Sequence, residues 1–361
     1  MKIVTLTHPQ KLDTTEFPAG IPLLMDDANA GTMLMFPGVR LAEWNTVEMP
    51  SESTRHLLII RCGGYGDLLF LQPVVAELGR RHPDMRVSVA VADRFAEAAE
   101  RAMILAHPDC QIEPYPIPLD RLSQFDCVVP LENLVEFGDA SQSMHVIDIF
   151  AARLGVALDD QDKRMQWRVT DEEAQQIRER FPRIRRSDGA TCRRVGIVLT
   201  ASARCRSWPP GRIAELLTIL RGKGVETCLI GMPGQSDVDG QGIVNSTAAD
   251  PPLTFCESVA LAASCDVVVS PDTAHTHYAA AAGTPVVALY GPFPWRLRTA
   301  YQPLTQAITG NAPCAPCHHH SRGYQFPPGM PCVEAGKCIA MADIAAERVA
   351  AKVIAILRQG K

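Results

Sequence analysis

The sequence lacks the features that define several large classes of protein. No apolar run approaches the roughly 20 residues that a membrane-spanning helix needs, and the N-terminal stretch MKIVTLTHPQKLDTTEFP has no apolar signal core. The net charge of −5 over 361 residues gives no overall attraction to nucleic acid or to an anionic membrane. We therefore expect a cytoplasmic protein with no transmembrane segment and no nucleic-acid partner, for which only peripheral membrane contact stays open.

Two nucleotide-binding fingerprints are missing as well. A G-x-G-x-x-G motif starting at Gly64 would need a glycine at position 69, where Leu69 stands. The phosphate-loop pattern G-x-x-x-x-G-K-[ST] does not occur in the sequence. The glycine-rich turn at residues 62–67 is therefore not interpreted as a dinucleotide site.

What is present is the composition of a soluble globular protein. Hydrophobic residues make up 47% and charged residues 21% of the chain, which is long enough for two domains of ordinary size. Most of the 12 cysteines stand singly in expected strands or helices. In a cytosolic chain, such cysteines are best interpreted as buried thiols.

Buried-strand runs alternate with helical segments through most of the chain. An expected strand at 56–61 and a turn precede a helix over 68–81, and a strand at 267–269 precedes a helix over 276–282 and a strand over 285–290. Strand, helix and parallel strand are the repeating unit of an α/β sheet. The pattern predicts two doubly wound, Rossmann-like domains that face a cleft. Further expected elements are strands at 87–92, 127–131, 195–200 and 226–230, and helices at 171–181, 213–222, 253–264 and 345–357.

Changes in composition suggest the domain boundaries. A charged helix at 171–181 and a basic stretch at 183–194 read as a connector, because a new strand starts directly after them. Residues 1–55 have little periodicity, and they form either a small hairpin extension or a contact in a homo-oligomer. The expected parts are an N-terminal extension at 1–55, a first domain at 56–170, a connector at 171–194, a second domain at 195–310 and a C-terminal part at 311–361.

One loop stands where open α/β sheets bind their ligands. Asp272, Thr273, His275 and His277 follow a strand at its carboxyl end and open a helix. The positive end of that helix favours an anion, and a diphosphate is the obvious one. The alternative is that Asp272 or Thr273 merely caps the helix, which is the usual role of these residue types.

The glycine-rich turn offers a second polar group. Gly63, Gly64 and Gly66 lack Cβ, so the backbone can approach a ligand closely. Asp67 would then place a carboxylate at the mouth of the first sheet. A role as a helix N-cap is an equally good interpretation of Asp67 on local grounds.

Four segments in this order resemble a known family. They are RCGGYGDLLFLQPVVAEL, SARCRSWPP, GMPGQ and VVVSPDTAHTHYAAAAGTPVVALYGP, and they span about residues 56 to 310. The chain resembles the ADP-heptose:lipopolysaccharide heptosyltransferases, glycosyltransferase family nine. The resemblance implies a GT-B fold with an N-terminal acceptor domain and a C-terminal domain for the nucleotide-sugar donor, in a bacterial cytoplasm.

The resemblance also implies roles for single residues. Asp67 matches the proposed general base, Ser202 and Arg206 match groups that face the donor diphosphate, and His277 matches the family's histidine. Arg206 replaces the usual lysine, and it can bind two phosphate oxygens at once. Further matches are Gly231 in the GMPGQ turn, Gln235 near the ribose, and Asp272, Thr273 and Ala274 in the phosphate-facing loop.

Two of these positions depart from the family pattern. Ala274 stands where glycine is usual, which restricts the backbone and its approach to a ligand. Gln235 is neutral where a glutamate is common, so the nucleotide preference is open.

The resemblance implies that the enzyme transfers a sugar with inversion of configuration. Heptose is the first candidate for the sugar, with ADP-heptose as the donor. Asp67 would take the proton from an acceptor hydroxyl, and no divalent metal would be needed for this step. The acceptor could be lipopolysaccharide core, another glycan or a protein. The alternatives are another nucleotide-sugar enzyme, such as an epimerase, and a non-catalytic sugar-nucleotide-binding protein.

The C-terminal part carries a separate signal. Cys314, Cys317, Cys332 and Cys338 form the pattern C-x2-C-x14-C-x5-C, which is typical of a tetrahedral structural metal site. Zinc is the generic expectation, and a disulfide pair is the main rival. Iron is the alternative, because the autotransporter heptosyltransferases, a subgroup that the chain resembles, carry a four-cysteine iron site. The histidines at 318–320 are read as solvated loop residues.

Overall fold

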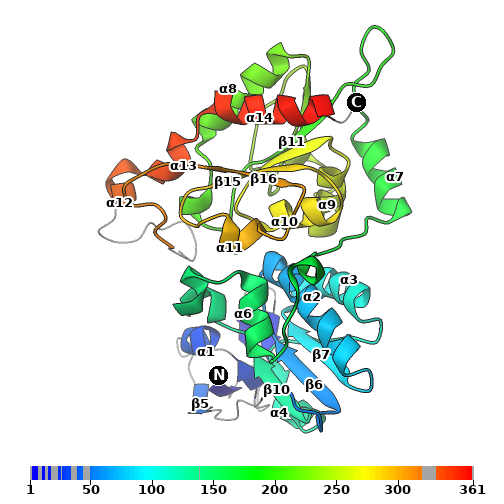
Figure 1. Ribbon diagram of the computed structural model, residues 1–361, viewed down its shortest axis with the longest axis vertical. Helices are drawn as coiled ribbons and strands as arrows, with labels where there is room; N and C mark the ends of the chain where they lie inside the picture. The colour runs from blue at the N-terminus through cyan, green and yellow to red at the C-terminus, as the bar shows by residue number, and fades with distance from the viewer. Residues whose placement is uncertain are drawn as a thin grey trace. The chain divides into compact units, whose positions relative to one another are not determined.

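A computed structural model describes residues 2–6, 10–12, 15–17, 23–25, 27–33, 39–43, 49–137, 139–318 and 331–359. The chain divides into two compact units, residues 1–165 and 166–361, and each unit is described by itself (Figure 1). Within the described ranges, none of the helices combines the length and the apolar character that crossing a membrane requires.

Unit 1 is built on a four-stranded parallel sheet with the order β10-β6-β7-β8. Every residue of β6 is buried, as expected for a central parallel strand covered on both faces. The strands are β6 (His56–Ile60), β7 (Arg86–Val91), β8 (Gln111–Pro114) and β10 (Cys127–Pro130), and the main helices are α2 (Tyr65–Arg81), α3 (Ala96–Ala106) and α6 (Val146–Arg153).

Helix α2 begins earlier than the sequence predicts, and this changes the place of Asp67. Gly64 adopts a φ of 91°, a conformation that favours glycine, and the helix starts at Tyr65 instead of Leu68. Asp67 therefore lies in the first turn of α2 and not in the loop before it.

Residues 1–55 contribute an antiparallel sheet to unit 1. Its order is β5-β1-β4-β9, and its fourth strand comes from the middle of the unit. Val4, Leu24 and Met33 pack in one apolar cluster with Leu58 and Ile60 of the parallel sheet. The elements are β1 (Lys2–Leu6), β4 (Leu23–Met25), α1 (Asp27–Met33), β5 (Val39–Glu43) and β9 (Ile117–Pro118), with a separate hairpin of β2 (Gln10–Leu12) and β3 (Thr15–Phe17).

Unit 2 holds a six-stranded parallel sheet with the order β13-β12-β11-β14-β15-β16. The chain starts in the middle of this sheet and winds outwards in both directions, so the doubly wound expectation is confirmed. The strands are β11 (Arg194–Val198), β12 (Glu226–Ile230), β13 (Ile243–Asn245), β14 (Val267–Pro271), β15 (Val286–Tyr290) and β16 (Thr305–Thr309).

Helices cover both faces of this sheet (Figure 1). One face packs against α8 (Pro210–Gly222) and α14 (Ala346–Gln359), and the other against α7 (Asp171–Arg180), α9 (Phe255–Ala263) and α10 (Ala274–Ala281). Thr170 and Thr254 begin α7 and α9 with complete capping boxes, in which Glu173 and Glu257 return the hydrogen bond.

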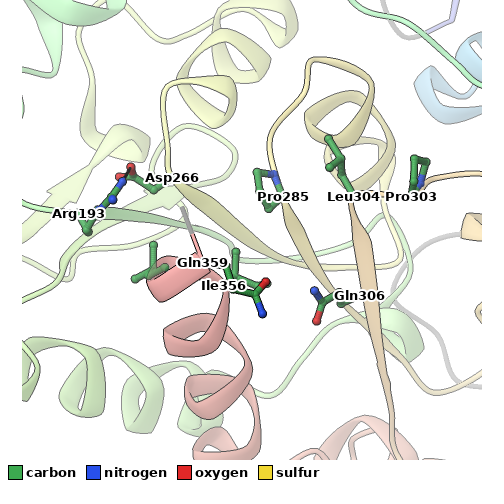
Figure 2. Close-up of a pocket in the computed structure, with 9 residues that line it drawn as sticks. Arg193, Asp266, Pro285, Pro303, Leu304, Gln306, Ile356 and Gln359 are labelled. Carbon is green, nitrogen blue, oxygen red and sulfur yellow. Dashed lines mark hydrogen bonds and ion pairs between the residues drawn. The ribbon is translucent and has the colours of Figure 1, made fainter. Parts of the chain in front are cut away.

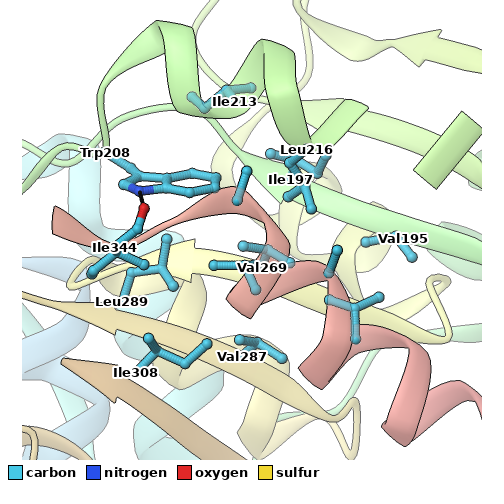
Figure 3. Close-up of a cluster of buried hydrophobic side chains, with 14 of the residues drawn as sticks. Val195, Ile197, Trp208, Ile213, Leu216, Val269, Val287, Leu289, Ile308 and Ile344 are labelled. Carbon is cyan, nitrogen blue, oxygen red and sulfur yellow. Dashed lines mark hydrogen bonds between the residues drawn. The ribbon is translucent and has the colours of Figure 1, made fainter. Parts of the chain in front are cut away.

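Trp208 anchors the first of these two faces. Its indole Nε1 donates to the carbonyl of Ile344 at 3.1 Å, and the ring lies beside Ile213 and Leu289 (Figure 3). A buried indole N–H without a partner would be costly, so this bond ties the segment before α14 to the loop after β11.

The remaining short elements of the described residues connect the larger ones. They are η1 (Asp93–Phe95), α4 (Leu119–Leu122), α5 (Leu134–Phe137), η2 (Asp139–Gln142), η3 (Asp160–Lys163), η4 (Arg204–Arg206), η5 (Ser246–Ala248), α11 (Arg296–Thr299), α12 (Pro331–Ala335) and α13 (Ile339–Asp343).

A substitution at Gly310 tests how tightly the chain packs against Ala340. A Cβ at Gly310 would lie 1.7 Å from the backbone carbonyl oxygen of Ala340, which cannot move aside as a side chain can. We expect Gly310→Ala to lower the free energy of unfolding by about 3 kcal/mol, at the upper end of overpacking costs. Gly211 in α8 has open space around it, and Gly211→Ala should be neutral or stabilising by up to about 1 kcal/mol. Urea unfolding of both variants checks the contrast, and equal midpoints would contradict it.

Candidate functional site

The predicted donor residues of unit 2 gather at the carboxyl edge of its sheet. They lie on the loops after β11, β12 and β14. Between the neighbours β11 and β14, the order in which strands are added to the sheet reverses. Ligands of open α/β sheets bind at such a reversal point. The three loops are far apart in the sequence and meet only because parallel strands end at one edge.

Asp272 is the centre of this group. It follows β14 directly and is only 3% exposed. Its Oδ2 lies 3.4 Å from Arg206 Nη1, and its Oδ1 lies 4.0 Å from His277 Nε2. Arg206 Nη1 also donates to the Asp272 carbonyl at 3.1 Å. A buried carboxylate needs a cationic partner such as Arg206, because transfer out of water disfavours an unpaired charge.

Arg206 is therefore held from two sides. Its Nη1 contacts Asp272, and its Nη2 donates to Ser202 Oγ at 2.6 Å. The guanidinium is 18% exposed, so part of it reaches solvent. The structure thus brings three predicted residues together, with a cation at the surface of the loop.

Two hydrogen bonds hold the side chain of Gln235. Its Oε1 accepts from the Met232 backbone at 2.9 Å, and its Nε2 donates to Thr200 Oγ1 at 2.6 Å. A Cβ at Gly231 would lie 2.2 Å from Gln235 Oε1, so a larger residue there would displace the end of the Gln235 side chain. Gln235 and Gly231 join the loop after β12 to the loop after β11.

The loop after β14 opens helix α10. Thr273 occupies the N-cap position, but its side chain makes no capping hydrogen bond, and Ala274 is the first helical residue, two positions before the predicted start. The carboxylate of Asp272 faces Arg206 and His277. The interpretation that Thr273 caps the helix is therefore wrong. The Asp272 carboxylate pairs with Arg206.

Two histidines of α10 are neutral at physiological pH. Burial lowers the pKa of His277 to about 4, although the nearby Asp272 carboxylate acts in the opposite direction. Burial likewise lowers the pKa of His275 to about 4. Gln302 Nε2 lies 2.8 Å from His277 Nδ1, and Ser258 Oγ lies 2.9 Å from His275 Nε2. Both rings are thus fixed by hydrogen bonds.

Sequence reasoning missed Arg298 of α11. Arg298 is 3% exposed, its Nε lies 3.9 Å from Asp272 Oδ2, and its guanidinium stacks on Phe293 at 4.5 Å from the ring centre. It follows the carboxyl end of β15, the next strand along the same edge. The strand order alone places this segment at the same edge of the sheet as Asp272. That position is the signal from which Arg298 could have been predicted.

Asp67 forms a separate network in unit 1. Arg61, 2% exposed at the end of β6, donates from Nη2 to Asp67 Oδ2 at 2.5 Å and to Glu136 Oε1 at 2.6 Å. Glu132 Oε1 accepts from the Cys62 backbone at 2.5 Å, and its Oε2 lies 3.8 Å from Arg61 Nη1. Burial alone would lower the pKa of Arg61, but the three carboxylates around it raise that pKa well above its usual value.

The structure argues against a role of Asp67 as the N-cap of α2. The N-cap of α2 is Gly64, without a side-chain capping bond, and the Asp67 carboxylate contacts Arg61 instead. The glycine-rich turn brings Asp67 close to its own backbone, since a Cβ at Gly64 would lie 2.4 Å from Asp67 Oδ2. A Cβ at Gly63 would lie 3.0 Å from the Phe95 ring. Gly66, the third glycine of the predicted turn, is inside α2.

The four predicted metal ligands lie in the described residues, and so do the other eight cysteines; none of the twelve forms a disulfide. Burial, with smaller contributions from Cys205 and Cys317, raises the pKa of Cys338 to about 11. Burial also raises the pKa of Cys332, with contributions from Cys314 and Cys205. Cys205 and Cys338 belong to one apolar cluster, against which Cys314 packs. Within the described ranges, however, no three Cys, His, Asp or Glu side chains are gathered to hold a metal.

A hollow of about 320 Å³ lies elsewhere on unit 2 (Figure 2). Its lining includes Asp266, Pro285 and Leu304, which precede β14, β15 and β16, so it is at the amino edge of the sheet. Arg193 pairs with Asp266 at 2.8 Å on one side of it. Parallel sheets bind ligands at the opposite edge, and we assign no function to this hollow.

Two α/β units with parallel, doubly wound sheets match the GT-B fold, which is the fold class expected from the sequence. The family model of glycosyltransferase family 9 (heptosyltransferase) matches residues 138–325, more than half of the chain. The chain therefore belongs to glycosyltransferase family 9. The resemblance found in the motifs is confirmed, and the protein is an enzyme that transfers a sugar.

Solved structures support the fold. ADP-heptose LPS heptosyltransferase II of E. coli is 18% identical and has a TM-score of 0.60, covering 84% of this chain and 99% of its own. The iron-containing dodecameric glycosyltransferase TibC of enterotoxigenic E. coli is 15% identical, with a TM-score of 0.62 and coverage of 90% and 83%. A family 9 glycosyltransferase of Veillonella parvula is 14% identical, with a TM-score of 0.57 and coverage of 84% and 97%. No curated protein matches the sequence.

The burial of His277 predicts a pH-dependent stability. Its pKa is about 4 in the folded protein and about 6.5 in an unfolded chain, so the unfolded state binds the extra proton between these values. We expect the free energy of unfolding to fall as the pH drops from about 6.5 to about 4, by up to about 3 kcal/mol from this residue. His277→Gln should remove this part of the pH dependence in urea unfolding. Comparison at pH 7 gives the cost of the substitution itself, and identical pH profiles would contradict the assignment.

Proposed function

We propose that the protein is an inverting heptosyltransferase that uses ADP-heptose as donor. The observation that carries the proposal is the cationic cluster around Asp272, which holds Arg206 next to the N-terminus of α10. A guanidinium and a helix N-terminus are the two groups that proteins use most often for phosphate oxygens. Membership of a heptosyltransferase family supports heptose as the sugar, and TibC has been crystallised with ADP-D-β-D-heptose.

The donor would bind through its diphosphate at this cluster. Departure of ADP leaves negative charge on the phosphate oxygens, and a preorganised cation lowers the energy of that charge in the transition state. Arg206 is preorganised by Ser202 and Asp272, so little side-chain freedom is lost on binding. Arg298 adds a second positive charge beside the same carboxylate. Thr273, Ala274 and His277 would line the phosphate-facing loop, with Gly231 and Gln235 toward the ribose.

Asp67 would act as the general base in the acceptor domain at 56–170. It would accept the proton of an acceptor hydroxyl while that oxygen attacks the anomeric carbon and the bond to ADP breaks, which inverts the configuration. The single charge of Arg61 is shared by Asp67, Glu136 and Glu132. Arg61 therefore orients the Asp67 carboxylate that would accept the proton.

The acceptor would be a hydroxyl of a glycan, such as lipopolysaccharide core, or of a protein, and the reaction would occur in the bacterial cytoplasm. TibC is dodecameric, and a homo-oligomer of this chain is consistent with the same fold. We place its contact in the antiparallel sheet of residues 1–55.

Calorimetry on the purified protein tests the donor site. We expect ADP-heptose to bind more tightly than UDP-glucose, GDP-mannose or NAD, and Arg206→Ala to weaken that binding at least about tenfold through loss of a charge-assisted hydrogen bond. Asp67→Asn is the matched control in unit 1. It should keep the affinity for ADP-heptose and slow transfer by about 100- to 10,000-fold.

Other outcomes would redirect the proposal. If the protein prefers another sugar nucleotide, heptose is not the transferred sugar, but the assignment as a glycosyltransferase stands. Full transfer by Asp67→Asn would remove Asp67 from the role of base. A wild-type protein that binds none of these nucleotides would overturn the donor site and favour a non-catalytic function.

We also propose that Cys314, Cys317, Cys332 and Cys338 bind one structural metal ion, either zinc or iron. The donor set supports this, because soft thiolates suit both metals and two of the four thiols are already buried. Cys314 packs against the apolar cluster that contains Cys338. The iron in TibC, which shares the fold, supports iron. Four thiolate ligands would leave no open position, so the ion would stabilise structure and take no part in transfer.

Elemental analysis of the purified protein tests the metal site. We expect about one zinc or iron per chain in the wild type and a large loss in Cys332→Ser, because a three-thiolate site binds much more weakly. Cys192→Ser is the control, since Cys192 lies in the basic stretch before β11 and outside the four-cysteine pattern. Wild-type protein without a stoichiometric metal would overturn the proposal.

A further inference from the structure

The turn that carries Arg206 also contacts the C-terminal part of the chain. Arg206 ends the single turn η4, which begins at Arg204. On the donor side of this turn are the contacts of Arg206 with Ser202 and Asp272. Arg204 Nη2 instead donates to the carbonyl of Gly336 at 2.9 Å. The turn is therefore held between two different parts of unit 2.

We call residues 331–344 the cysteine segment, since it contains Cys332 and Cys338. Cys205, the middle residue of η4, is 2% exposed and packs in the same apolar cluster as Cys338, Met341 and Ile344. Two residues after Arg206, Trp208 donates to the Ile344 carbonyl at 3.1 Å. Three side chains of residues 204–208 thus face the cysteine segment, and Arg206 between them faces Asp272.

The cysteine segment supports the other donor-side loops as well. A Cβ at Gly291, which follows β15, would lie 3.2 Å from the backbone nitrogen of Met341. Asn311 N donates to Asp343 Oδ2 at 2.8 Å just after β16. The segment therefore packs under the carboxyl edge of the sheet along several strands. Its contacts reach loops on both sides of Asp272.

We infer that the cysteine segment positions Arg206 for the donor diphosphate, with Arg204 as the positioning residue that joins the two. The inference rests on the proposed function, because it assumes that Arg206 binds a phosphate group. Binding sites lose affinity when the residues that orient the binding group become loose, even if no contact to the ligand is removed. Arg204 would act in this way through its bond to Gly336.

Calorimetry with ADP as the probe tests this role on the full chain. We expect Arg204→Ala to raise the Kd for ADP about three- to tenfold, the range that a single hydrogen bond supplies, with the thermal midpoint nearly unchanged. Arg204→Lys, which keeps a donor at the end of a long side chain, should restore most of the affinity. Arg212→Ala is the matched control. Arg212 donates to Ala342 of the same segment at 3.3 Å, but from α8 and not from the turn.

A double-mutant cycle distinguishes positioning from direct contact. If Arg204 acts through Arg206, Arg204→Ala has no further effect on the Kd in a protein that already carries Arg206→Ala. Additive effects would mean that Arg204 contacts the nucleotide itself and would overturn the inference. An unchanged Kd in the single variant would overturn it as well.

Hydrogen exchange provides a readout that needs no nucleotide. The amides of Arg206 and Ser207 bond to Ala203 and Arg204 carbonyls within the turn. These amides should exchange faster in Arg204→Ala than in Arg212→Ala, and equal exchange would contradict the positioning role. Wild-type protein that does not bind ADP would overturn the proposed function, while faster exchange in Arg204→Ala would still support the link between the turn and the cysteine segment.

Discussion

The proposed donor site of this protein depends on a carboxylate that is almost removed from water. Asp272 is 3% exposed, and it remains ionised at low cost only if positive groups surround it. Arg206 and Arg298 supply them from two loops that the sheet topology brings together. The buried negative charge thus fixes the place of the positive charges. A diphosphate arriving at the same edge would meet cations that are already ordered.

Unit 1 uses the reverse arrangement. There the buried group is the cation, Arg61, and the carboxylates of Asp67, Glu132 and Glu136 surround it. The arginine holds these carboxylates in place, and Asp67 is the one that is proposed to accept a proton. In each unit, one buried charge at the carboxyl end of a central strand organises the side chains that are proposed to act.

The sequence allowed the parallel sheets to be predicted, because long buried runs and glycine-rich turns are local signals. It also led to Asp67, Arg206, Asp272 and His277, which stand in motifs of the family. The partners of these residues were not predictable in the same way. Arg61 reads as the end of a hydrophobic strand, and Arg298 lies beyond the last motif, so both became visible only from the contacts of the folded chain.

Other differences have equally physical causes. The strands in residues 1–55 are three to five residues long, and β4 pairs with a strand more than 90 residues away. Such pairing has no local signature in the sequence. The position of Cys205 beside the later cysteines was missed for the same reason, since nothing in the pattern C-x2-C-x14-C-x5-C points to a residue more than 100 positions earlier.

The position of α14 has a consequence for how the chain folds as it is synthesised. Val349, Val353 and Leu357 of this helix complete the apolar layer that begins with Val195 of β11. Unit 1 has all of its elements once residue 165 has left the ribosome, whereas unit 2 exposes one face of its sheet until α14 follows. Domains generally fold as units during synthesis. Unit 1 is therefore expected to be folded while unit 2 is still incomplete. The nascent unit 2 is the part of the chain most in need of a chaperone.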